Sequence, residues 1–186
     1  MEQRHNQDRH SLLFIIILGM LTAIGPLAID MFLTGLPELK NDFNTTTANA
    51  QLTLSFFMIG LGIGNLFVGP ISDSMGRKKP LIIVMIVFTL ASLGIIFVHN
   101  IWLMIVLRLL QGITGGGAAV ISRAIASDLY KGNELTKFLS LLMLVNGVAP
   151  VIAPALGGII LSVAVWRVVF VILTIFCILM IIGSLI

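Results

Sequence analysis

Charged residues are scarce in this sequence. Asp, Glu, Lys and Arg make up 10% of its 186 residues, whereas an ordinary soluble domain carries about 25%. Hydrophobic residues account for 58%, and the mean hydropathy is +1.11. A soluble domain of this size needs a polar surface, and the chain has too few polar residues to build one. The composition therefore predicts a membrane protein.

Cysteine and histidine are also rare. Cys177 is the single cysteine and lies in an apolar run, so neither a disulfide within the chain nor a thiolate metal site is expected. The three histidines are far apart, and no G-x-x-x-x-G-K-[ST] phosphate-binding motif is present. The connections between apolar runs are too short to hold a soluble domain. We therefore expect no metal, no cofactor and no enzyme activity.

Six apolar segments are long enough to cross a bilayer, which takes about 20 helical residues. We predict an all-α membrane protein with spans at residues 11–36, 48–69, 80–98, 101–125, 138–161 and 166–186, preceded by a polar tail over residues 1–10. The first span is too long for the apolar region of a signal peptide and shows no clear cleavage site. We expect it to remain as a membrane helix.

Lys and Arg are distributed unevenly between the connections. Eight of the eleven lie in the tail, in the turn at 70–79 and in the connection at 123–137, and only two lie in the alternate connections. An excess of basic residues marks the cytoplasmic side. We therefore predict a multi-pass protein of the plasma membrane with a cytoplasmic amino terminus. The cations form no basic face, so nucleic acid is not expected as a partner.

Two charges fall inside predicted spans, Asp30 and Arg108. Such a charge costs about 2.5–3.5 kcal/mol on insertion scales, so it usually faces a protein interior or a water-filled cavity. Both residues lie about 10 Å from the outer end of their predicted spans, so they are expected to be able to pair. Either the pair only fixes helix packing, or Asp30 carries a proton in a transport cavity and Arg108 modulates its pKa. Polar amides also lie within the spans, at Gln51, Asn65, Gln111 and Asn146.

The densest charge is in residues 69–81, GPISDSMGRKKPL, between the second and third spans. This stretch resembles the loop signature of the major facilitator superfamily, G-x-L-x-D-R-x-G-R-[KR]-x-x-L, with Ile71 in place of Leu and Ser74 in place of Arg. The matching positions include Gly69, Asp73, Gly76, Arg77 and Lys78.

The resemblance implies roles for these charges. In the superfamily the acid at the position of Asp73 caps a helix in the other half of the transporter. The arginine at the position of Arg77 bridges to an acid at the cytoplasmic end of the fourth span, for which Asp128 is the match. Together they imply a latch that holds the outward-facing state and breaks when the halves rock apart. The alternative is a solvated loop that only enforces topology.

Two further stretches resemble signatures of drug transporters. Residues 107–115, LRLLQGITG, match the helix-four signature R-x-x-Q-G-x-x-x-[GA], which implies that Arg108 takes part in proton coupling. Residues 149–158, APVIAPALGG, match the helix-five antiporter signature G-x-x-x-G-P-x-x-G-G, with Ala at its first two glycines. A bent helix that packs closely against the opposite half is implied. The residues concerned are Arg108, Gln111 and Gly112 in helix four, and Pro150, Pro154, Gly157 and Gly158 in helix five.

Residues 30–37, DMFLTGLP, resemble the helix-one sequence D-M-Y-L-P-A-L-P of the Bcr/CflA drug:proton antiporters. The resemblance implies export of small apolar or amphipathic drugs, driven by the proton gradient without a cofactor. Superfamily members have twelve spans in two halves of 3+3 inverted repeats, so we expect an amino-terminal half that requires a complementary six-helix half. A metabolite or sugar symporter and a truncated fragment without transport activity are the alternatives.

Overall fold

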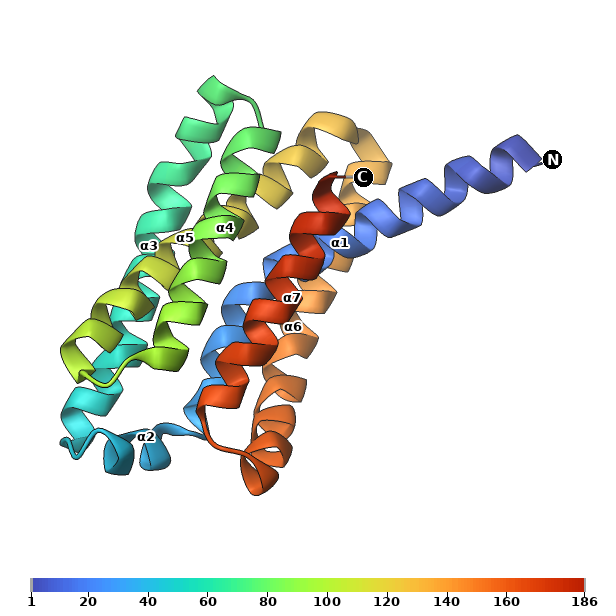
Figure 1. Cartoon of the computed structure of the whole chain (residues 1–186). Helices are drawn as coiled ribbons and strands as arrows, with labels where there is room; N and C mark the ends of the chain where they lie inside the picture. Colours follow the sequence, from blue (N-terminus) through green and yellow to red (C-terminus); the bar gives the residue numbers. More distant parts are fainter. Residues whose placement is uncertain (1, 186) are drawn as a thin grey trace.

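The computed structural model describes the backbone of residues 2–185 and the side chains of residues 16–184. Every element in this part of the chain is a helix (Figure 1). Six of the helices are long and apolar enough to cross a membrane, so the prediction of an all-α protein with six spans is confirmed. Met1 and Ile186, the ends of the predicted tail and sixth span, lie outside the described residues. The helices are α1 (Glu2–Leu33), α2 (Leu36–Asp42), α3 (Thr47–Met75), α4 (Lys78–Phe97), α5 (Ile101–Leu129), α6 (Gly132–Val163) and α7 (Arg167–Leu185).

Several helices extend beyond the predicted spans at the end of the bundle that carries the α3–α4 loop. α3 continues past residue 69 to Met75, α5 continues past residue 125 to Leu129, and α6 begins at Gly132 rather than at residue 138. The predicted polar tail is also helical from Glu2. Hydropathy marks only the part of a helix that is apolar, whereas the helix continues through polar residues because its backbone hydrogen bonds are internal.

The predicted first span, 11–36, contains a break at its far end. α1 stops at Leu33, and the short helix α2 starts at Leu36 and lies at the end of the bundle (Figure 1). A Cβ atom added at Gly35 would lie 3.2 Å from Cβ of Trp166. Glycine therefore lets this turn approach the start of α7 closely.

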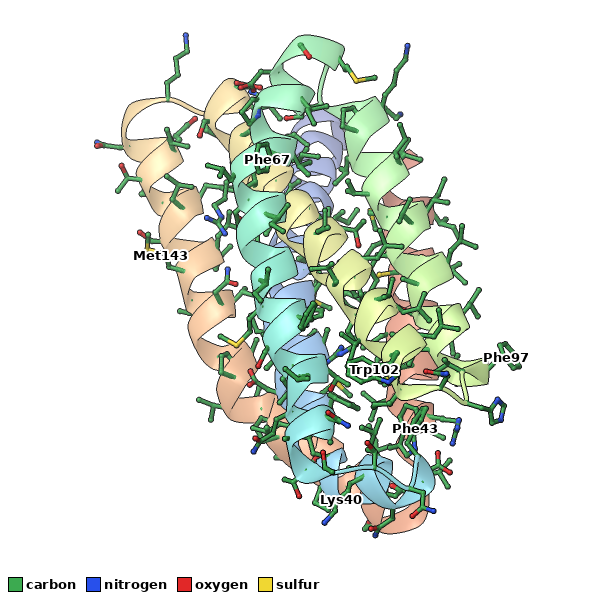
Figure 2. All side chains as sticks on the ribbon, turned by 90° about the vertical axis from the view of Figure 1, so that its left-hand side faces the viewer. Lys40, Phe43, Phe67, Phe97, Trp102 and Met143 are labelled. Carbon is green, nitrogen blue, oxygen red and sulfur yellow. The ribbon has the colours of Figure 1, made fainter. Side chains whose placement is uncertain are left out.

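α5 is the central helix of the bundle. It packs along α3 and also against α4 and α1, while α6 packs on α1, and α7 packs on α4 and α1. Among the described spans, α5 is consequently the most buried and α6 the least. The outer faces of α3 and α6 are apolar and exposed, as Figure 2 shows for Phe67 and Met143.

Glycines allow the close contact between α3 and α5. A Cβ atom added at Gly60 or Gly64 of α3 would overlap backbone oxygens of α5, and one added at Gly112 or Gly116 of α5 would overlap backbone oxygens of α3. In each helix the two glycines are four residues apart, a spacing that places small residues on one face and lets two backbones meet in lipid. Gly112 of the helix-four signature is therefore a packing residue.

Arg167 joins three elements at the end of the bundle opposite the α3–α4 loop. Its Nε donates to the carbonyl oxygen of Ile96 at 3.1 Å, and its Nη2 donates to that of Val98 at 3.2 Å, both at the end of α4. Its Nη1 forms an ion pair with Asp42 at the end of α2. The Nε1 of Trp166 donates to the same carboxylate at 3.0 Å. These contacts hold the ends of α2 and α4 on the start of α7.

We expect Arg167→Gln to lower the free energy of unfolding by about 1.5–3 kcal/mol, because hydrogen bonds from a charged donor are lost at partly buried carbonyls. Thermal unfolding of the purified protein in detergent measures the change. Arg167→Lys keeps the charge but loses the planar guanidinium, so its melting temperature should lie between those of the unmodified protein and Arg167→Gln. An unchanged melting temperature for Arg167→Gln would contradict this role.

Candidate functional site

Three charged side chains form a cluster at the end of the bundle that carries the α3–α4 loop. In that loop, Arg77 donates from Nε to Oδ2 of Asp128 in α5 at 2.8 Å, and from Nη1 to Oγ of Ser72 at 2.9 Å. Its Nη1 also forms an ion pair with Asp73. The hydrogen bond to Asp128 raises the pKa of the Arg77 guanidinium, so this group stays charged. We call Asp73, Arg77 and Asp128 the rim cluster, and the predicted contact between Arg77 and Asp128 is confirmed.

Two glycines of the loop signature position this cluster. Gly76 ends α3 with a φ of +81°, a backbone conformation that favours glycine, and the chain then turns into α4. A Cβ atom added at Gly69 would lie 3.0 Å from Cγ1 of Val120. α3 therefore runs close to α5 just before the loop, which brings Arg77 within reach of the end of α5.

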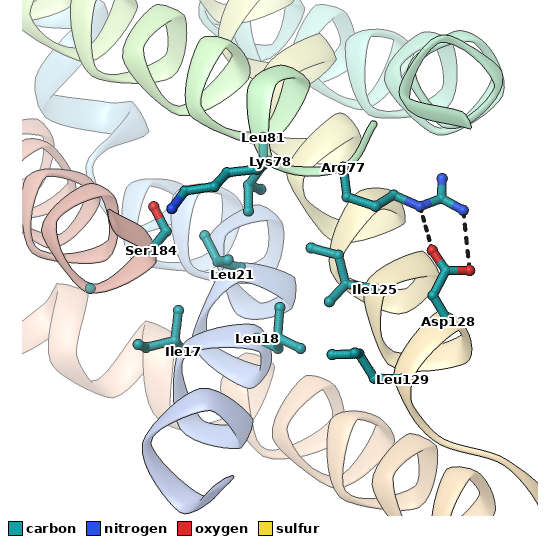
Figure 3. A pocket seen from close by; sticks show the side chains of 11 residues that line it. Ile17, Leu18, Leu21, Arg77, Lys78, Leu81, Ile125, Asp128, Leu129 and Ser184 are labelled. Carbon is teal, nitrogen blue, oxygen red and sulfur yellow. Dashed lines mark hydrogen bonds and ion pairs between the residues drawn. The ribbon is translucent and has the colours of Figure 1, made fainter. Parts of the chain in front are cut away.

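A cavity of about 420 Å³ lies beside the rim cluster, between α1, α4, α5 and α7. Figure 3 shows Lys78 extending across it toward Ser184 of α7, away from the ion pair of Arg77 and Asp128. The other described lining side chains are mainly leucine and isoleucine. Arg77 and Asp128 of the rim cluster also line this cavity, and Lys78 lines it without joining their ion pair.

Arg108 lies in the middle of the bundle with its side chain 0% exposed. Its Nη1 and Nη2 both donate to the carbonyl oxygen of Ala28 in α1 at 3.2 Å, and Nη1 also donates to Oε1 of Gln111 at 2.8 Å. Gln111 in turn donates to Oγ of Ser92 in α4 at 2.7 Å. Arg108 and Gln111 of the helix-four signature therefore connect α5 to α1 and α4.

Three aromatic rings complete the surroundings of Arg108. The ring centroids of Phe32, Phe57 and Phe170 lie 4.4, 4.6 and 5.4 Å from its Cζ atom, within the distance of about 6 Å at which a cation and a ring attract each other. Its Nε has no hydrogen-bond partner among the described residues. The guanidinium is thus held by carbonyl, amide and ring contacts in place of a carboxylate.

In the described part of the chain, Asp30 and Arg108 do not form the ion pair that their predicted depths suggested. The expected depths agree, because Arg108 binds the carbonyl oxygen of Ala28 and lies against the ring of Phe32, one on each side of Asp30 in the sequence. The difference lies in the rotation of α1, since Asp30 is two residues from each of them and therefore lies on the opposite face of the helix. Asp30 is partly exposed and lies on the same helix face as Pro26 and Leu33.

The residues of the helix-five signature lie on different faces of α6. A Cβ atom added at Gly157 would lie 2.5 Å from the carbonyl oxygen of Met31, so this glycine packs α6 on α1. Gly158 and Pro150 are exposed, and Pro154 is partly exposed. Gly157 therefore acts within this bundle, and a contact of the exposed residues with an opposite half stays a prediction.

A groove between α5 and α6 was not expected from the sequence. The groove has a volume of about 460 Å³, and Arg123 and Asn146 are among its lining residues. Arg123 had been assigned to the connection at 123–137, but α5 continues to Leu129. The available signal was the absence of glycine and proline from residues 118–131, which is typical of an uninterrupted helix.

Comparisons with known proteins agree with this arrangement. The Major Facilitator Superfamily pattern matches residues 14–186. The chain is 45% identical over 184 residues to the MFS-type transporter YdgK of Bacillus subtilis and 34% identical over 165 residues to a bicyclomycin resistance protein homolog of Haemophilus influenzae. It is 28% identical over 163 residues to multidrug resistance protein D of Escherichia coli.

These alignments cover 97%, 89% and 88% of this chain, but only 44%, 42% and 41% of the respective relatives. The chain thus spans less than half the length of the curated relatives that it matches. The family match extends over all six spans and includes the loop that holds the rim cluster. The chain belongs to the Major Facilitator Superfamily, and its fold is a six-helix half of that kind of transporter.

Proposed function

We propose that this chain supplies one half of a proton-coupled exporter of drugs or antibiotics in the plasma membrane. The observation that carries the proposal is its identity to relatives named for bicyclomycin and multidrug resistance, combined with a carboxyl group, Asp30, inside an apolar helix. The proton gradient supplies about 2.3 kcal/mol per charge per 100 mV. That energy is enough to move a compound outward against its concentration.

Asp30 is proposed as the group that carries the proton. It is partly exposed, and no ion pair within the described residues includes it. A carboxyl group without a fixed counter-ion takes up and releases a proton without breaking an ion pair. Intramembrane carboxyl groups of this kind mark proton and substrate pathways in transporters.

Arg108 is proposed as a positioning residue for α1 and not as the counter-ion of Asp30. It binds the carbonyl oxygen of Ala28 and the ring of Phe32, which lie on either side of Asp30 in the sequence. If a change in the charge of Asp30 shifts α1, the contacts of Arg108 with Ala28 and Phe32 would therefore change as well. Through Gln111 the same shift would reach α4.

We propose that a second six-helix unit covers the exposed apolar faces of α3 and α6. The large exposed apolar side chains there, such as Leu66, Phe67 and Val151, support this arrangement, as does the length of the relatives. With the amino terminus in the cytoplasm, the rim cluster would lie at the cytoplasmic contact between the two units. Asp73, whose side chain is 60% exposed, is available there to cap a helix of the second unit.

The function is tested in vesicles that contain this chain joined to its second six-helix unit. We expect addition of a substrate drug to release protons, and an imposed proton gradient to drive drug transport in the opposite direction. The 186-residue chain alone should give no flux, because the faces of α3 and α6 then remain uncovered.

Two results would contradict the proposal. Drug and protons moving in the same direction would indicate a symporter. Flux through the isolated chain, under conditions in which it is monomeric, would show that no second unit is needed.

A further inference from the structure

The groove between α5 and α6 holds an exposed arginine within the helical bundle. It is lined by Arg123 of α5 and by Leu139, Leu142, Met143, Asn146 and Gly147 of α6. α5 and α6 make little contact with each other, so the groove stays open between them. Arg123 lies six residues before the end of α5, which corresponds to about 9 Å along the helix axis.

Arg123 differs from the other arginines with described side chains. Arg77 and Arg167 each pair with an aspartate, and Arg108 is enclosed by carbonyl, amide and ring groups. The Arg123 guanidinium has no acceptor among the described residues, and the side chain is exposed. A cation within a membrane-spanning helix usually faces water or an opposite charge. Its partner is therefore expected to come from outside this part of the chain.

Asn146 provides a second, fixed polar group in the groove. Its Nδ2 donates to Oγ1 of Thr22 in α1 at 3.0 Å and to the carbonyl oxygen of Leu142 at 2.8 Å. These two bonds use both amide hydrogens and fix the plane of the amide. The Oδ1 atom receives no hydrogen bond from the described residues, so it remains available as an acceptor.

The remaining lining of the groove is apolar. Leu139, Leu142 and Met143 supply it, and Met143 is 74% exposed. A site with an apolar wall and a few fixed polar groups is typical of small-molecule binding, and a volume of about 460 Å³ lies within the range of such sites. The combination of one unpaired cation with an apolar wall selects a ligand that has a negative charge on an apolar body.

We propose that this groove binds amphipathic organic acids, with the ligand carboxylate on Arg123 and its apolar body along Leu139 and Met143. The guanidinium offers two parallel donors to a carboxylate, and Oδ1 of Asn146 accepts from a hydroxyl or amide group of the ligand. The proposal rests on the proposed function in one respect: the ligand is taken to be a compound that the transporter exports. An anionic membrane lipid shares the same chemistry and is the second possible source.

The test measures binding without transport. The purified chain in phosphatidylcholine nanodiscs is titrated with dansylaminoundecanoic acid and with its uncharged methyl ester, and dansyl fluorescence reports the Kd of each. We expect the acid to bind about tenfold more tightly than the ester, because the ester lacks the charge-assisted hydrogen bonds. Arg123→Gln should abolish this difference, Arg123→Lys should keep part of it, and Lys137→Gln, which removes a cation outside the groove, should leave it unchanged.

Equal affinities of the acid and the ester for the unmodified chain, or an unchanged preference in Arg123→Gln, would overturn the proposal. Loss of the preference in Lys137→Gln as well would overturn it too, since a general surface potential would then be responsible. Competition by phosphatidylglycerol in the nanodiscs would support the site and identify a lipid as its occupant, whereas no competition would support a soluble ligand. Because no proton gradient or second unit is used, this outcome is independent of the antiport test.

Discussion

Gly112→Ala is expected to destabilise the bundle by about 3 kcal/mol, the upper part of the usual range for an overpacked site. The added methyl group would overlap the carbonyl oxygen of Phe57 and lie 3.0 Å from Cα of Gly60. Neither atom belongs to a side chain that can rotate away, so α3 and α5 must separate. Thermal unfolding in detergent should show a melting temperature about 10 °C lower.

Gly62→Ala is the matched control for this experiment. Gly62 lies in α3, the partner helix of this contact, and a Cβ atom added there meets nothing within 4 Å. Alanine in a helix interior is favoured over glycine by about 0.5–1 kcal/mol, so this variant should be as stable as the unmodified protein or slightly more stable. Equal melting temperatures for Gly112→Ala and Gly62→Ala would mean that the helices are not in backbone contact at Gly112.

Asp30→Asn is expected to abolish uphill transport in the complete exporter. With one proton per cycle and a potential of 100 mV, about 2.3 kcal/mol sustains a concentration ratio of about 50 for an uncharged drug. Asparagine cannot carry the proton, so the ratio should fall to about 1. Drug accumulation in energised vesicles measures this ratio, and downhill exchange of labelled drug should remain.

Two variants control for indirect effects of the Asp30 substitution. Asp30→Glu keeps a carboxyl group and should retain part of the accumulation. Glu134→Gln removes an exposed acid from the first turn of α6 and should retain all of it. Full accumulation by Asp30→Asn would refute the assignment of Asp30 as the proton carrier, while the role of the chain as half of an exporter would stand on the transport test alone.

Spans and local motifs were predictable because their signals lie within short stretches of sequence. About 20 consecutive apolar residues suffice to indicate a membrane helix, and all six spans were found. The loop signature at residues 69–81 has its glycines and charges at fixed spacing. The resemblance of this stretch to the superfamily signature implied the contact of Arg77 with Asp128, which are 51 residues apart.

Predictions of contacts between residues failed where the contact depended on how two helices pack against each other. The pairing of Asp30 with Arg108 was wrong because the hydropathy of α1 did not reveal its rotation: Ala28 and Phe32 face Arg108, and Asp30 between them lies on the opposite face of the helix. The contacts of Arg167 with Ile96 and Val98 were also not foreseen. Backbone carbonyls are present at every residue, so no sequence pattern marks the two that accept these bonds.

The sequence alone determined that the chain crosses a membrane six times, which turns carry charge, and which superfamily it resembles. These properties follow from composition and spacing, because lipid demands apolar helices of sufficient length whatever their neighbours are. Only the tertiary structure decided that Arg108 binds a carbonyl and three rings instead of a carboxylate, and that Arg123 and Asn146 share a groove. Such contacts depend on the relative depth, rotation and separation of packed helices, which the order of residues within a single helix does not specify.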